Sequence, residues 1–483
     1  MNHSPPGGFL DKNMTALLLG FIFLLNVCLT ILPACSQGKP NIIFILTDDQ
    51  SAWSLGCLGN TQAHTPNLNR LFDGGVTLSN CFVTTPVCSP SRASLFTSRY
   101  GSELGITDWI SPKTEPHIGL SRSVSTWPKV LQNSGYDTCL VGKWHLGTDR
   151  KYHPHHHGFN HFYGFASGGV TVTDPVLCVD DATEECKGFT DDILTDRAIR
   201  FLNEKENSRP FLLCLHLRSP HAPWKPFAED DYKPYSEIDP IIPNPAFPEL
   251  DIEKVKDITR QYLTSITGID RNIGRLLKHL DERHLRQNTV IIFTSDNGYN
   301  IGHNGIWHKG NGHKITLDVR GLPSSHPTNQ RPNMYDTSLL VPAVIDIPGH
   351  DKNIKKMDRV VSSLDWYPTI LSIAGLPCDS TPLIRGHNFL PLLKGESISW
   401  GDDLYGEYGQ HHYTRADLKM IRTTEWKYIV DQSGSYGEEL YHLTRDPDET
   451  ANLADDNQYQ EIKAGLRNRL KKAIEEIDKT RLY

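Results

Sequence analysis

Several features are scarce or missing in the 483-residue sequence, and each absence excludes a class of protein. There is no internal repeat and no low-complexity linker, which excludes repeat arrays and long disordered connections. There is no excess of basic residues: the formal net charge is −8, whereas nucleic-acid binding needs clustered Lys and Arg. The cysteines show no spacing typical of a metal site. We therefore expect a globular protein with no nucleic acid as a partner.

The N-terminal residues are typical of an export signal. Lys12 is followed by an apolar run over residues 14–32, which has the character of a signal peptide and could just span a bilayer. The sequence LPAC, ending at Cys35, resembles a bacterial lipoprotein cleavage box, and an uncleaved membrane anchor is a third alternative. We expect residues 1–36 to be a signal peptide or lipoprotein leader. The protein is then secreted or periplasmic, with a membrane partner only if Cys35 carries a lipid.

Two cysteines are candidates for a disulfide bond, which export permits. Cys178 and Cys186 flank the acidic segment CVDDATEEC, although two unpaired cysteines fit the sequence equally well. Cys139 and Cys214 lie in apolar runs and are most simply small core residues.

Buried strands alternate with helices along most of the chain. Residues 41–46 form a continuous apolar run with β-branched side chains, which is typical of a strand buried on both faces. Further strands are predicted over 136–144, 210–220 and 289–298, and helices over 65–75, 124–135, 190–205 (capped by Thr190) and 252–282. The alternation predicts an α/β domain over residues 37–400, with a large, mainly parallel sheet covered by helices on both faces.

The sequence changes character from about residue 401. Four short segments with partial alternation of apolar and polar residues follow one another between residues 403 and 443, separated by turns. A charged helix is predicted over residues 458–477. We expect residues 401–483 to form a small α+β subdomain with an antiparallel sheet.

Two pairs of polar residues end two of the predicted strands. Asp48 and Asp49 follow the first strand, and Asp296 and Asn297 follow the strand that begins at residue 289. If those strands are neighbours, four oxygen ligands converge, three of them anionic, which suits Ca²⁺ or Mg²⁺ better than zinc. Either pair alone is also an ordinary turn former. The matching positions of the two pairs favour a metal site.

The segment CSPSR, from Cys88 to Arg92, puts a thiol and a guanidinium at a predicted helix start. Pro90 suits the first turn of a helix, so Cys88 or Ser89 lies near the N-cap, where free amide hydrogens attract an oxyanion. Arg92, one turn further on, can bind the same anion. From the residues alone, Cys88 can be half of a disulfide, a thiolate nucleophile or the precursor of another group.

Further candidates lie in loops after other strands. Lys143 and His145 follow one strand and His221 follows another, although for each histidine alone a structural role is the ordinary interpretation. Two lysines, Lys309 and Lys314, lie a short distance after the second carboxylate pair. These residues are candidates for binding an anion or moving protons.

Taken in chain order, the motifs TDDQ, CSPSR, GKWHLG, SPHAPW and SDNG resemble those of the formylglycine-dependent sulfatases of the alkaline-phosphatase-like superfamily. The similarity covers residues 39–456, nearly all of the mature chain, and includes the C-terminal segment ELYHLTRDPDETANLA. Any one motif alone is weak, whereas the C-x-P-S-R signature among these neighbours is highly specific. The resemblance implies an alkaline-phosphatase-like fold, with residues 37–400 as the catalytic domain.

The resemblance also implies a nucleophile and a metal. Cys88 would be oxidised to Cα-formylglycine by a separate maturation enzyme, and its hydrate would form a covalent sulfo-enzyme intermediate. The metal would be Ca²⁺, with Mg²⁺ as the alternative. Its ligands would be residue 88 together with Asp48, Asp49, Asp296 and Asn297.

Five further positions match residues that act on sulfate or on protons in that family. Arg92, Lys143 and a lysine at 309 or 314 match the residues that neutralise sulfate, with Lys309 the better match. His221 matches the histidine that faces the leaving alcohol, a general acid. His145 matches the one beside formylglycine, a base for the elimination step.

The resulting hypothesis is an exported sulfuric ester hydrolase that acts on a sulfated sugar or polysaccharide. A phosphate or phosphonate ester hydrolase of the same superfamily is an alternative, which the C-x-P-S-R context disfavours. If Cys88 is unmodified, a non-catalytic protein that binds sulfated glycans remains. Selection of substrate is expected from loops over residues 310–333 and 408–415. For His411 and His412 in the second loop, exposed loop histidines are the ordinary interpretation.

Overall fold

The structure is a computed structural model in which seven stretches of the chain are described: residues 1–4, 38–180, 182–205, 209–243, 248–316, 329–378 and 383–481. The chain divides into two units, Met1–Lys39 and Pro40–Tyr483. The predicted leader lies almost wholly outside the described residues, as does the middle of the predicted loop over 310–333. Within the described stretches, no helix combines the length and the apolar character needed to cross a bilayer.

The second unit is built on a sheet of ten strands in the order β14-β2-β13-β8-β1-β7-β3-β4-β5-β6. Its centre consists of four parallel strands that are almost entirely buried: β8 (Thr289–Ser295), β1 (Asn41–Thr47), β7 (Phe211–His216) and β3 (Asp137–Lys143). Apolar, β-branched runs form such strands because both of their faces are covered. The predicted α/β class with a mainly parallel sheet is confirmed.

Antiparallel pairing enters only toward the two flanks of this sheet. On one flank β13 (Val344–Asp346) runs antiparallel to both β8 and β2, and on the other β5 and β6 form a hairpin against β4. The remaining bounds are β2 (Val76–Phe82), β14 (Lys356–Ser362), β4 (His161–Phe165), β5 (Val176–Val179) and β6 (Ala182–Glu185).

The β5–β6 hairpin decides the alternative left open for two cysteines. Its register pairs Cys178 with Thr183, and the Cys186 amide donates to the carbonyl of Pro175. Three residues of strand therefore separate the two thiols along the hairpin, or about 10 Å. Both cysteines are free, so the unpaired alternative is the one observed.

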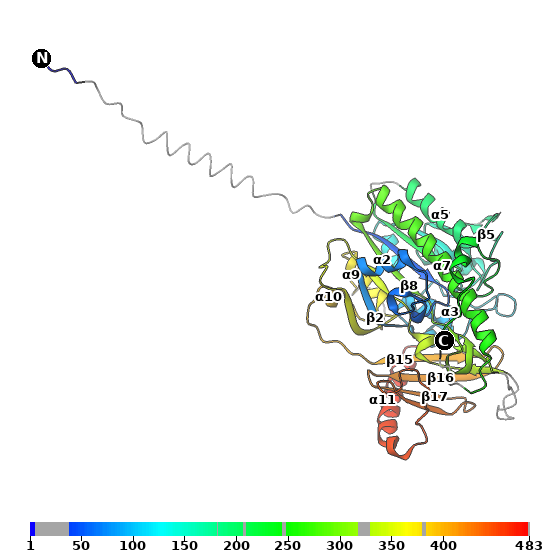
Figure 1. Cartoon of the computed structure of the whole chain (residues 1–483). Coiled ribbons are helices and arrows are strands. Elements are labelled where there is room, and N and C mark those ends of the chain that lie inside the picture. The colour runs from blue at the N-terminus through cyan, green and yellow to red at the C-terminus, as the bar shows by residue number, and fades with distance from the viewer. Residues whose placement is uncertain are drawn as a thin grey trace. The chain divides into compact units, whose positions relative to one another are not determined.

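Helices cover both faces of the sheet (Figure 1). Along β1, Ile42, Phe44 and Leu46 join one hydrophobic core, and Ile43 and Ile45 join the other. The first core is closed by α3 (Cys88–Thr97), α4 (Trp127–Asn133), α9 (Trp366–Ile373) and α10 (Leu390–Leu393). The second is closed by α2 (Pro66–Gly74), α5 (Thr190–Glu204) and α7 (Ile252–Glu282).

The helix predicted over 252–282 is observed as α7, which lies beside α5. The predicted cap of α5 is wrong: the helix begins at Thr190 itself, and Phe189 occupies the N-cap. The Thr190 hydroxyl donates instead to the carbonyl of Thr171, so it ties a loop to the helix. Two one-turn helices, α6 (Glu229–Tyr232) and α8 (Asp336–Leu339), complete the helices of this region.

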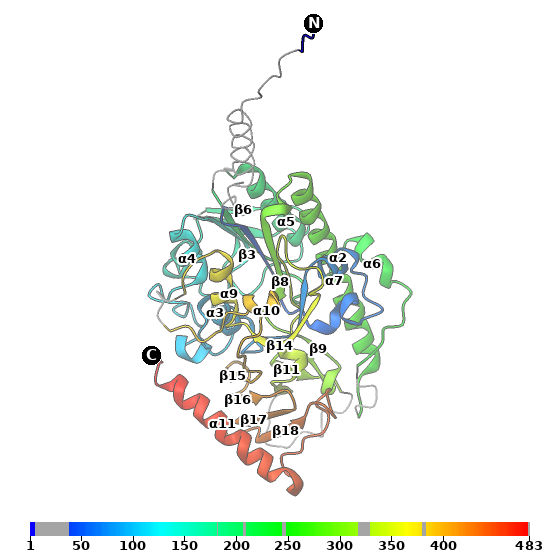
Figure 2. The ribbon, with the colours of Figure 1, turned by 90° about the vertical axis from the view of Figure 1, so that its left-hand side faces the viewer.

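The C-terminal region contains the expected antiparallel sheet, formed by β15 (Leu404–Gln410), β16 (Ala416–Arg422), β17 (Trp426–Asp431) and β18 (Glu438–His442). Figure 2 shows α11 (Gln460–Asp478) running alongside these strands, on which Leu466 and Leu470 pack. The backbone amide of Glu407 donates to the carbonyl of Thr84 at 2.9 Å, so β15 is joined directly to the segment before α3.

Another four-stranded sheet is formed by residues that lie, in the sequence, between β8 and β13 of the large sheet. Its strands are β9 (Asn300–Ile301), β10 (Ile306–His308), β11 (Asn311–Lys314) and β12 (Gln330–Pro332). The turn between β10 and β11 contains Lys309 and Gly310. This turn brings one of the candidate lysines to the site described next.

Candidate active site

The two carboxylate pairs meet because β1 and β8 are neighbours in register. Thr47 lies opposite Ser295, so Asp48, Asp49, Asp296 and Asn297 leave the same edge of the sheet. The amide of Asp49 donates to Asp296 Oδ1 at 3.1 Å, and Asn297 Nδ2 donates to Asp49 Oδ1 at 2.8 Å. All four side chains are buried. The structure thus brings together four oxygen-bearing groups that are almost 250 positions apart in the chain.

Cys88 opens α3 directly beneath these carboxylates. Val87 is the N-cap, so Cys88 is the first helical residue rather than the cap. Its Sγ lies 3.5 Å from Asp48 Oδ1 and 3.9 Å from Asp49 Oδ1, and the thiol is in no disulfide bond. An oxygen or sulfur atom from each of Cys88, Asp48, Asp49 and Asp296 lies close enough to the others to share one metal ion.

Three cations are buried against the carboxylates. Arg92 Nε donates to Asp296 Oδ2 at 2.8 Å, and Lys143 Nζ donates to Asp48 Oδ2 at 2.6 Å. Lys309 Nζ contacts Asp49 and lies 2.7 Å from Cys88 Sγ. Three acids and three bases therefore surround the thiol.

The two candidate lysines of this region are placed differently. Lys309 is buried at the turn that follows β10, with its Nζ against Cys88. Lys314 is half-buried at the end of β11, where it pairs in register with Ile306. Of the two, Lys309 is the one that the structure brings to the site.

The opposite charges at the site shift the pKa values of its carboxyl groups. Burial would raise the pKa of Asp48, but Lys143, His221 and Arg92 together outweigh it and hold that pKa below its usual value. Burial would likewise raise the pKa of Asp49, but Lys309 together with His221 and His308 lowers it. Burial by contrast raises the pKa of the Cys88 thiol well above its ordinary range despite the neighbouring lysines. The acids are ionised, whereas an unmodified thiol at this position holds its proton.

Buried polar atoms at the site lack hydrogen-bond partners among the described residues. They include two oxygens, Asp49 Oδ2 and Asn297 Oδ1, and one guanidinium nitrogen, Arg92 Nη2. Most buried polar atoms in native proteins have a hydrogen-bond partner, so these three atoms are available to a ligand. The two oxygens suit a hard divalent cation, and the nitrogen suits an anion. The residues present therefore fit Ca²⁺ or Mg²⁺ beside an oxyanion.

The two candidate histidines reach the site from different loops. His145 Nε2 lies 3.1 Å from the carbonyl of Ile110 and must carry the proton, so Nδ1 is unprotonated. His221 Nδ1 lies 2.6 Å from the carbonyl of Ala222, and its Nε2 is 3.9 Å from Asp49 Oδ2. Burial lowers the pKa of both imidazoles. Both are neutral, with one unprotonated nitrogen each.

Three residues at the site have a strained backbone. Asp49, His145 and His308 are non-glycine residues with φ of 72°, 57° and 85°, in the left-handed region. Tyr262, from α7, holds the first of them, since its hydroxyl donates to the Asp49 carbonyl at 2.7 Å and accepts from the amide of Ser51. Tertiary contacts of this kind maintain conformations that the local sequence disfavours.

Two of the supporting residues were not predicted from the sequence. Tyr262 lies in the middle of a long amphipathic helix and carries no local signal of a role at the site. His216 does carry one: it is a polar residue at the end of an apolar strand. Its Nδ1 donates to the carbonyl of Lys143 at 3.0 Å, the same oxygen that accepts from Arg92 Nη1.

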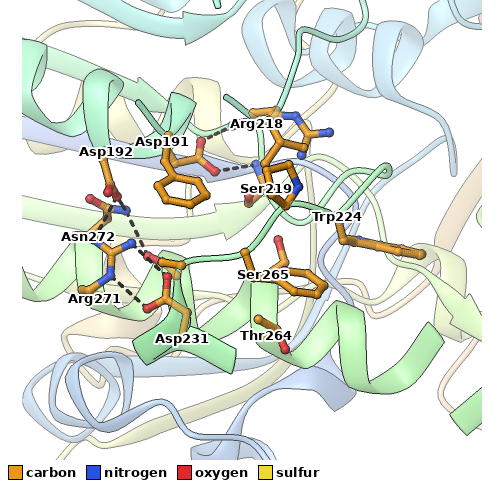
Figure 3. A pocket seen from close by; sticks show the side chains of 16 residues that line it. Asp191, Asp192, Arg218, Ser219, Trp224, Asp231, Thr264, Ser265, Arg271 and Asn272 are labelled. Carbon is orange, nitrogen blue, oxygen red and sulfur yellow. Dashed lines mark hydrogen bonds and ion pairs between the residues drawn. The ribbon is translucent and has the colours of Figure 1, made fainter. Parts of the chain in front are cut away.

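The loop that carries His221 forms part of the lining of a polar pocket (Figure 3), and side chains of this pocket fix the loop. Asp191, in the first turn of α5, accepts the amides of Arg218 at 2.8 Å and Ser219 at 3.2 Å. Trp224 Nε1 donates to the carbonyl of Pro220 at 2.6 Å and closes the loop on itself. The side chains that meet around Cys88 are not among those that line this pocket, which supports the loop rather than the chemistry.

Buried acids and cations around one nucleophile position, at the ends of parallel strands, fit an enzyme that acts on an anionic ester. Comparison with known proteins makes this specific. Residues 40–376 match the sulfatase family, and residues 326–476 match the C-terminal region of N-sulphoglucosamine sulphohydrolase. The chain belongs to the sulfatase family and is a sulfuric ester hydrolase.

Individual relatives are distant but cover most of the chain. An N-acetylglucosamine-6-O-sulfatase of Bacteroides thetaiotaomicron is 27% identical over 91% of this chain and 86% of its own. An arylsulfatase of Clostridium perfringens is 28% identical over 90% of this chain and 95% of its own.

Solved structures show the same fold. One, a protein in complex with its substrate D-glucosamine-2-N,6-O-disulfate, superimposes with a TM-score of 0.79 at 23% identity, covering 91% of this chain and 98% of that one. Another, a 2-O GAG sulfatase, gives a TM-score of 0.67 at 22% identity over 91% and 93% of the two chains.

Proposed function

We propose that the protein is an exported sulfatase that removes sulfate from a sulfated sugar or polysaccharide. The convergence of Arg92, Lys143 and Lys309 on residue 88 carries this proposal, because it puts three cations around one nucleophile position in a buried site. The sugar is supported by the relatives, one acting on N-acetylglucosamine 6-O-sulfate and one bound to a disulfated glucosamine. Export is supported by the sequence of residues 1–36.

The nucleophile in this proposal is formylglycine, made from Cys88 by a maturation enzyme. Once formed, it supplies a hydrated aldehyde whose one hydroxyl attacks sulfur and whose other hydroxyl later expels sulfate. The high pKa of the buried thiol is consistent with a precursor rather than a thiolate nucleophile.

The protein's own residues bind the sulfate and move the protons. Arg92 Nη2, which has no partner at present, donates to a sulfate oxygen, and the ammonium groups of Lys143 and Lys309 offset the charge that develops there. Because its Nδ1 faces the carbonyl of Ala222, His221 first takes up a proton at Nε2 and then gives that proton to the departing alcohol. The unprotonated Nδ1 of His145 takes the proton of the second hydroxyl when sulfate is released.

A divalent cation completes the proposed site. Ca²⁺, or Mg²⁺, would be held by Asp48, Asp49, Asp296 and Asn297 together with residue 88, and it supplies the charge that polarises a sulfate oxygen and lowers the pKa of the attacking hydroxyl. The orphaned oxygens of Asp49 and Asn297 support this assignment.

The test combines mass spectrometry with an assay of sulfate release. Protein expressed with a formylglycine-generating enzyme should yield a Cys88 peptide whose mass matches an aldehyde in place of the thiol. The same protein should release sulfate from at least one member of a panel of sulfated mono- and disaccharides. Release of phosphate but not sulfate would favour the phosphate ester alternative. Intact Cys88 with binding but no turnover would favour the glycan-binding alternative.

A further inference from the structure

Beside the nucleophile lies a group of rings and one acid that the proposed mechanism does not use. We call it the rim patch; it consists of Trp109, Glu115, His411, His412 and Tyr413. Trp109 and Glu115 come from the loop that follows α3, and the other three from the turn between β15 and β16. The ring of His412 lies 4.1 Å from that of Trp109, and the ring of Tyr413 lies 6.1 Å from it at 30°. Two segments distant in sequence therefore build one aromatic surface.

One end of the rim patch adjoins the wall of the active site. Trp109 precedes Ile110, whose amide donates to Ser89 Oγ at 3.0 Å and whose carbonyl faces His145 Nε2 at 3.1 Å. Ser89 is the neighbour of residue 88, and His145 is one of the two histidines of the site. The indole is thus one residue away from the groups around the nucleophile.

The other end of the rim patch continues toward Lys309. The ring of Tyr413 lies 6.4 Å from that of His313, which in turn lies 5.7 Å from that of His308. His308 immediately precedes Lys309. The row of rings therefore runs from the His145 side of the site to the Lys309 side. Tyr413 lies within this row and is strongly exposed to solvent, with 63% of its surface accessible.

The polar part of the rim patch is a carboxylate shared by two imidazoles. Glu115 accepts from His411 Nε2 at 2.6 Å and from His412 Nε2 at 3.0 Å, and the latter nitrogen also faces the carbonyl of Trp109 at 3.0 Å. These contacts place a ring proton on Nε2 of each imidazole, which leaves Nδ1 as the acceptor of a singly protonated ring; Nδ1 of His411 also lies 4.0 Å from Asp108 Oδ2. The side chain of His411 is 43% exposed and can offer this nitrogen to a hydroxyl group.

Asp108 fixes the backbone of the two histidines, and the three residues also lie close enough to share an ion. Its Oδ1 accepts from the Trp109 amide at 2.8 Å and the Tyr408 hydroxyl at 3.1 Å. Its Oδ2 accepts from the amides of His411 at 3.0 Å and His412 at 3.1 Å. Four donors already occupy this buried carboxylate, so its role is to position the backbone of the turn.

The charge of the rim patch limits what it can bind. Burial would raise the pKa of Glu115, but the amide of Ser111 and the two imidazoles lower it, so the carboxylate is ionised. A second sulfate or a carboxylate on this side would be repelled, whereas hydroxyl groups would find acceptors. Partly exposed aromatic rings suit the apolar face of a sugar.

We propose that the rim patch is the subsite for the sugar that carries the sulfate ester, with the ring lying on Trp109 and Tyr413 and its hydroxyls on His411 and His412. The sugar bears neutral hydroxyl groups, and no second anionic group, on the side that faces Glu115. This inference rests on the proposed function, since it names the substrate of the same site.

The first test removes the two rings. Trp109→Ala and Tyr413→Asn should each lower kcat/KM for the best monosulfated sugar of the panel by about 10–100-fold, mainly through KM. Asn is chosen because it tolerates the φ of 66° at position 413. Trp109→Phe should restore most of the activity. His387→Ala, a histidine with an exposed side chain outside the rim patch, is the matched control and should behave as wild type.

The second test addresses the charge. Glu115→Gln should raise kcat/KM for a sugar with a second sulfate relative to its monosulfated counterpart by about 10-fold. Wild-type kinetics in folded Trp109→Ala and Tyr413→Asn, or an unchanged ratio in Glu115→Gln, would overturn the corresponding part of the inference.

A titration without turnover separates the two proposals. Monosulfated sugar is titrated calorimetrically into Cys88→Ala protein, with and without Trp109→Ala. Weaker binding in the double variant supports the subsite even if no sulfate is ever released. Equal binding overturns the subsite even if the enzyme proves to be a sulfatase. Absence of sulfate release by the matured wild-type protein contradicts only the proposed function.

Discussion

Two arginines of this protein lie in buried clusters of opposite charge, and they use their hydrogen-bond donors differently. Arg422, on β16, directs Nε and Nη2 at Asp336 at 3.0 and 2.8 Å and covers the ring of Phe82. Lys427 joins the same acid to Glu449 at 2.5 Å. Arg92 also binds an acid, but its Nη2 is left without a partner. The first cluster ties β16 and β17 to α8, whereas the second leaves one guanidinium donor unpartnered.

The comparison shows that buried ion pairs alone do not identify an active site. Both clusters contain acids and bases in near-ideal contact, and both shift proton affinities. What distinguishes the cluster around residue 88 is that Arg92 Nη2 and Asn297 Oδ1 have no hydrogen-bond partner and that its charges converge on the end of one helix. A buried salt bridge is weak evidence of stability or function until its remaining donors and acceptors are counted.

The largest effect should come from removing the nucleophile. Cys88→Ala should reduce sulfate release by at least about 10³-fold, because no other group at the site can attack sulfur. Cys81→Ala, which truncates a buried cysteine of the core, is the matched control and should retain activity. Steady-state sulfate release and thermal unfolding measure the two effects. Substantial turnover in Cys88→Ala would remove residue 88 from the mechanism.

Metal removal should be nearly as damaging and should act only on the cluster around residue 88. Chelation should abolish activity, and Ca²⁺ or Mg²⁺ should restore it. Because a cation that binds only the folded state stabilises it, Ca²⁺ at 100 times its dissociation constant should add about 2.7 kcal/mol to the free energy of unfolding. Calorimetry of stripped protein checks this without an activity assay. Full activity and unchanged unfolding after stripping would rule out the metal.

Replacing each of the two arginines by alanine tests the comparison between the clusters directly. Arg92→Ala should lower kcat by about 10²–10³-fold, as expected for loss of one donor to a developing oxyanion. Arg422→Ala should leave kcat near wild type and destabilise the fold by roughly 2–4 kcal/mol, because it leaves Asp336 with one cation fewer. Kinetics and urea unfolding of both variants are needed. A loss of activity without a loss of stability in Arg422→Ala would erase the distinction.

The cluster at α8 should also make stability depend on pH. Burial raises the pKa of Glu449 from 4.5 to about 7 even though Lys427 opposes it. The folded state then holds a proton that the unfolded state has lost, so stability falls as pH rises from about 4.5 to about 7 and is level above that. The loss should be on the order of 3 kcal/mol. Glu449→Gln should flatten this slope in urea unfolding measured at pH 5 and pH 8; an unaltered slope would contradict the assignment.

The smallest effect is expected at Lys314. Lys314→Ala should change kcat/KM by no more than about twofold, whereas Lys309→Ala should lower it by about 10²-fold, because only Lys309 lies against residue 88. Parallel kinetics on one sulfated sugar measure both variants. A larger loss of kcat/KM in Lys314→Ala than in Lys309→Ala would contradict the assignment of sulfate binding to Lys309.

Much of the fold could be predicted from local patterns. The apolar run of β1 and the 3.6-residue periodicity of α7 are written in consecutive residues, and both elements appear where the sequence places them. The cap of α5 could not be predicted in this way, because the partner of the Thr190 hydroxyl comes from another segment. Whether Cys178 could form a disulfide bond depended likewise on the register of a hairpin.

The candidate site also contains some residues that local motifs predict and others that they do not. Motifs within a few residues, such as Cys88 with Arg92, were sufficient to nominate the groups that meet there. The supporting contacts could not be predicted from the sequence. Its local pattern indicates a core residue at Tyr262 and exposed loop histidines at His411 and His412. Their roles depend on which turn lies against which loop, as where Glu115 meets both imidazoles.

The sequence by itself determined the order of buried strands and helices, the residue types at each strand end and the family to which they belong. Only the tertiary structure decided that β1 and β8 are adjacent, that Lys309 rather than Lys314 reaches residue 88, and that Arg92 keeps a donor that Arg422 does not. The reason is physical: local periodicity reports which face of a segment is buried, whereas distances between charges depend on strand order and register, which join residues hundreds of positions apart.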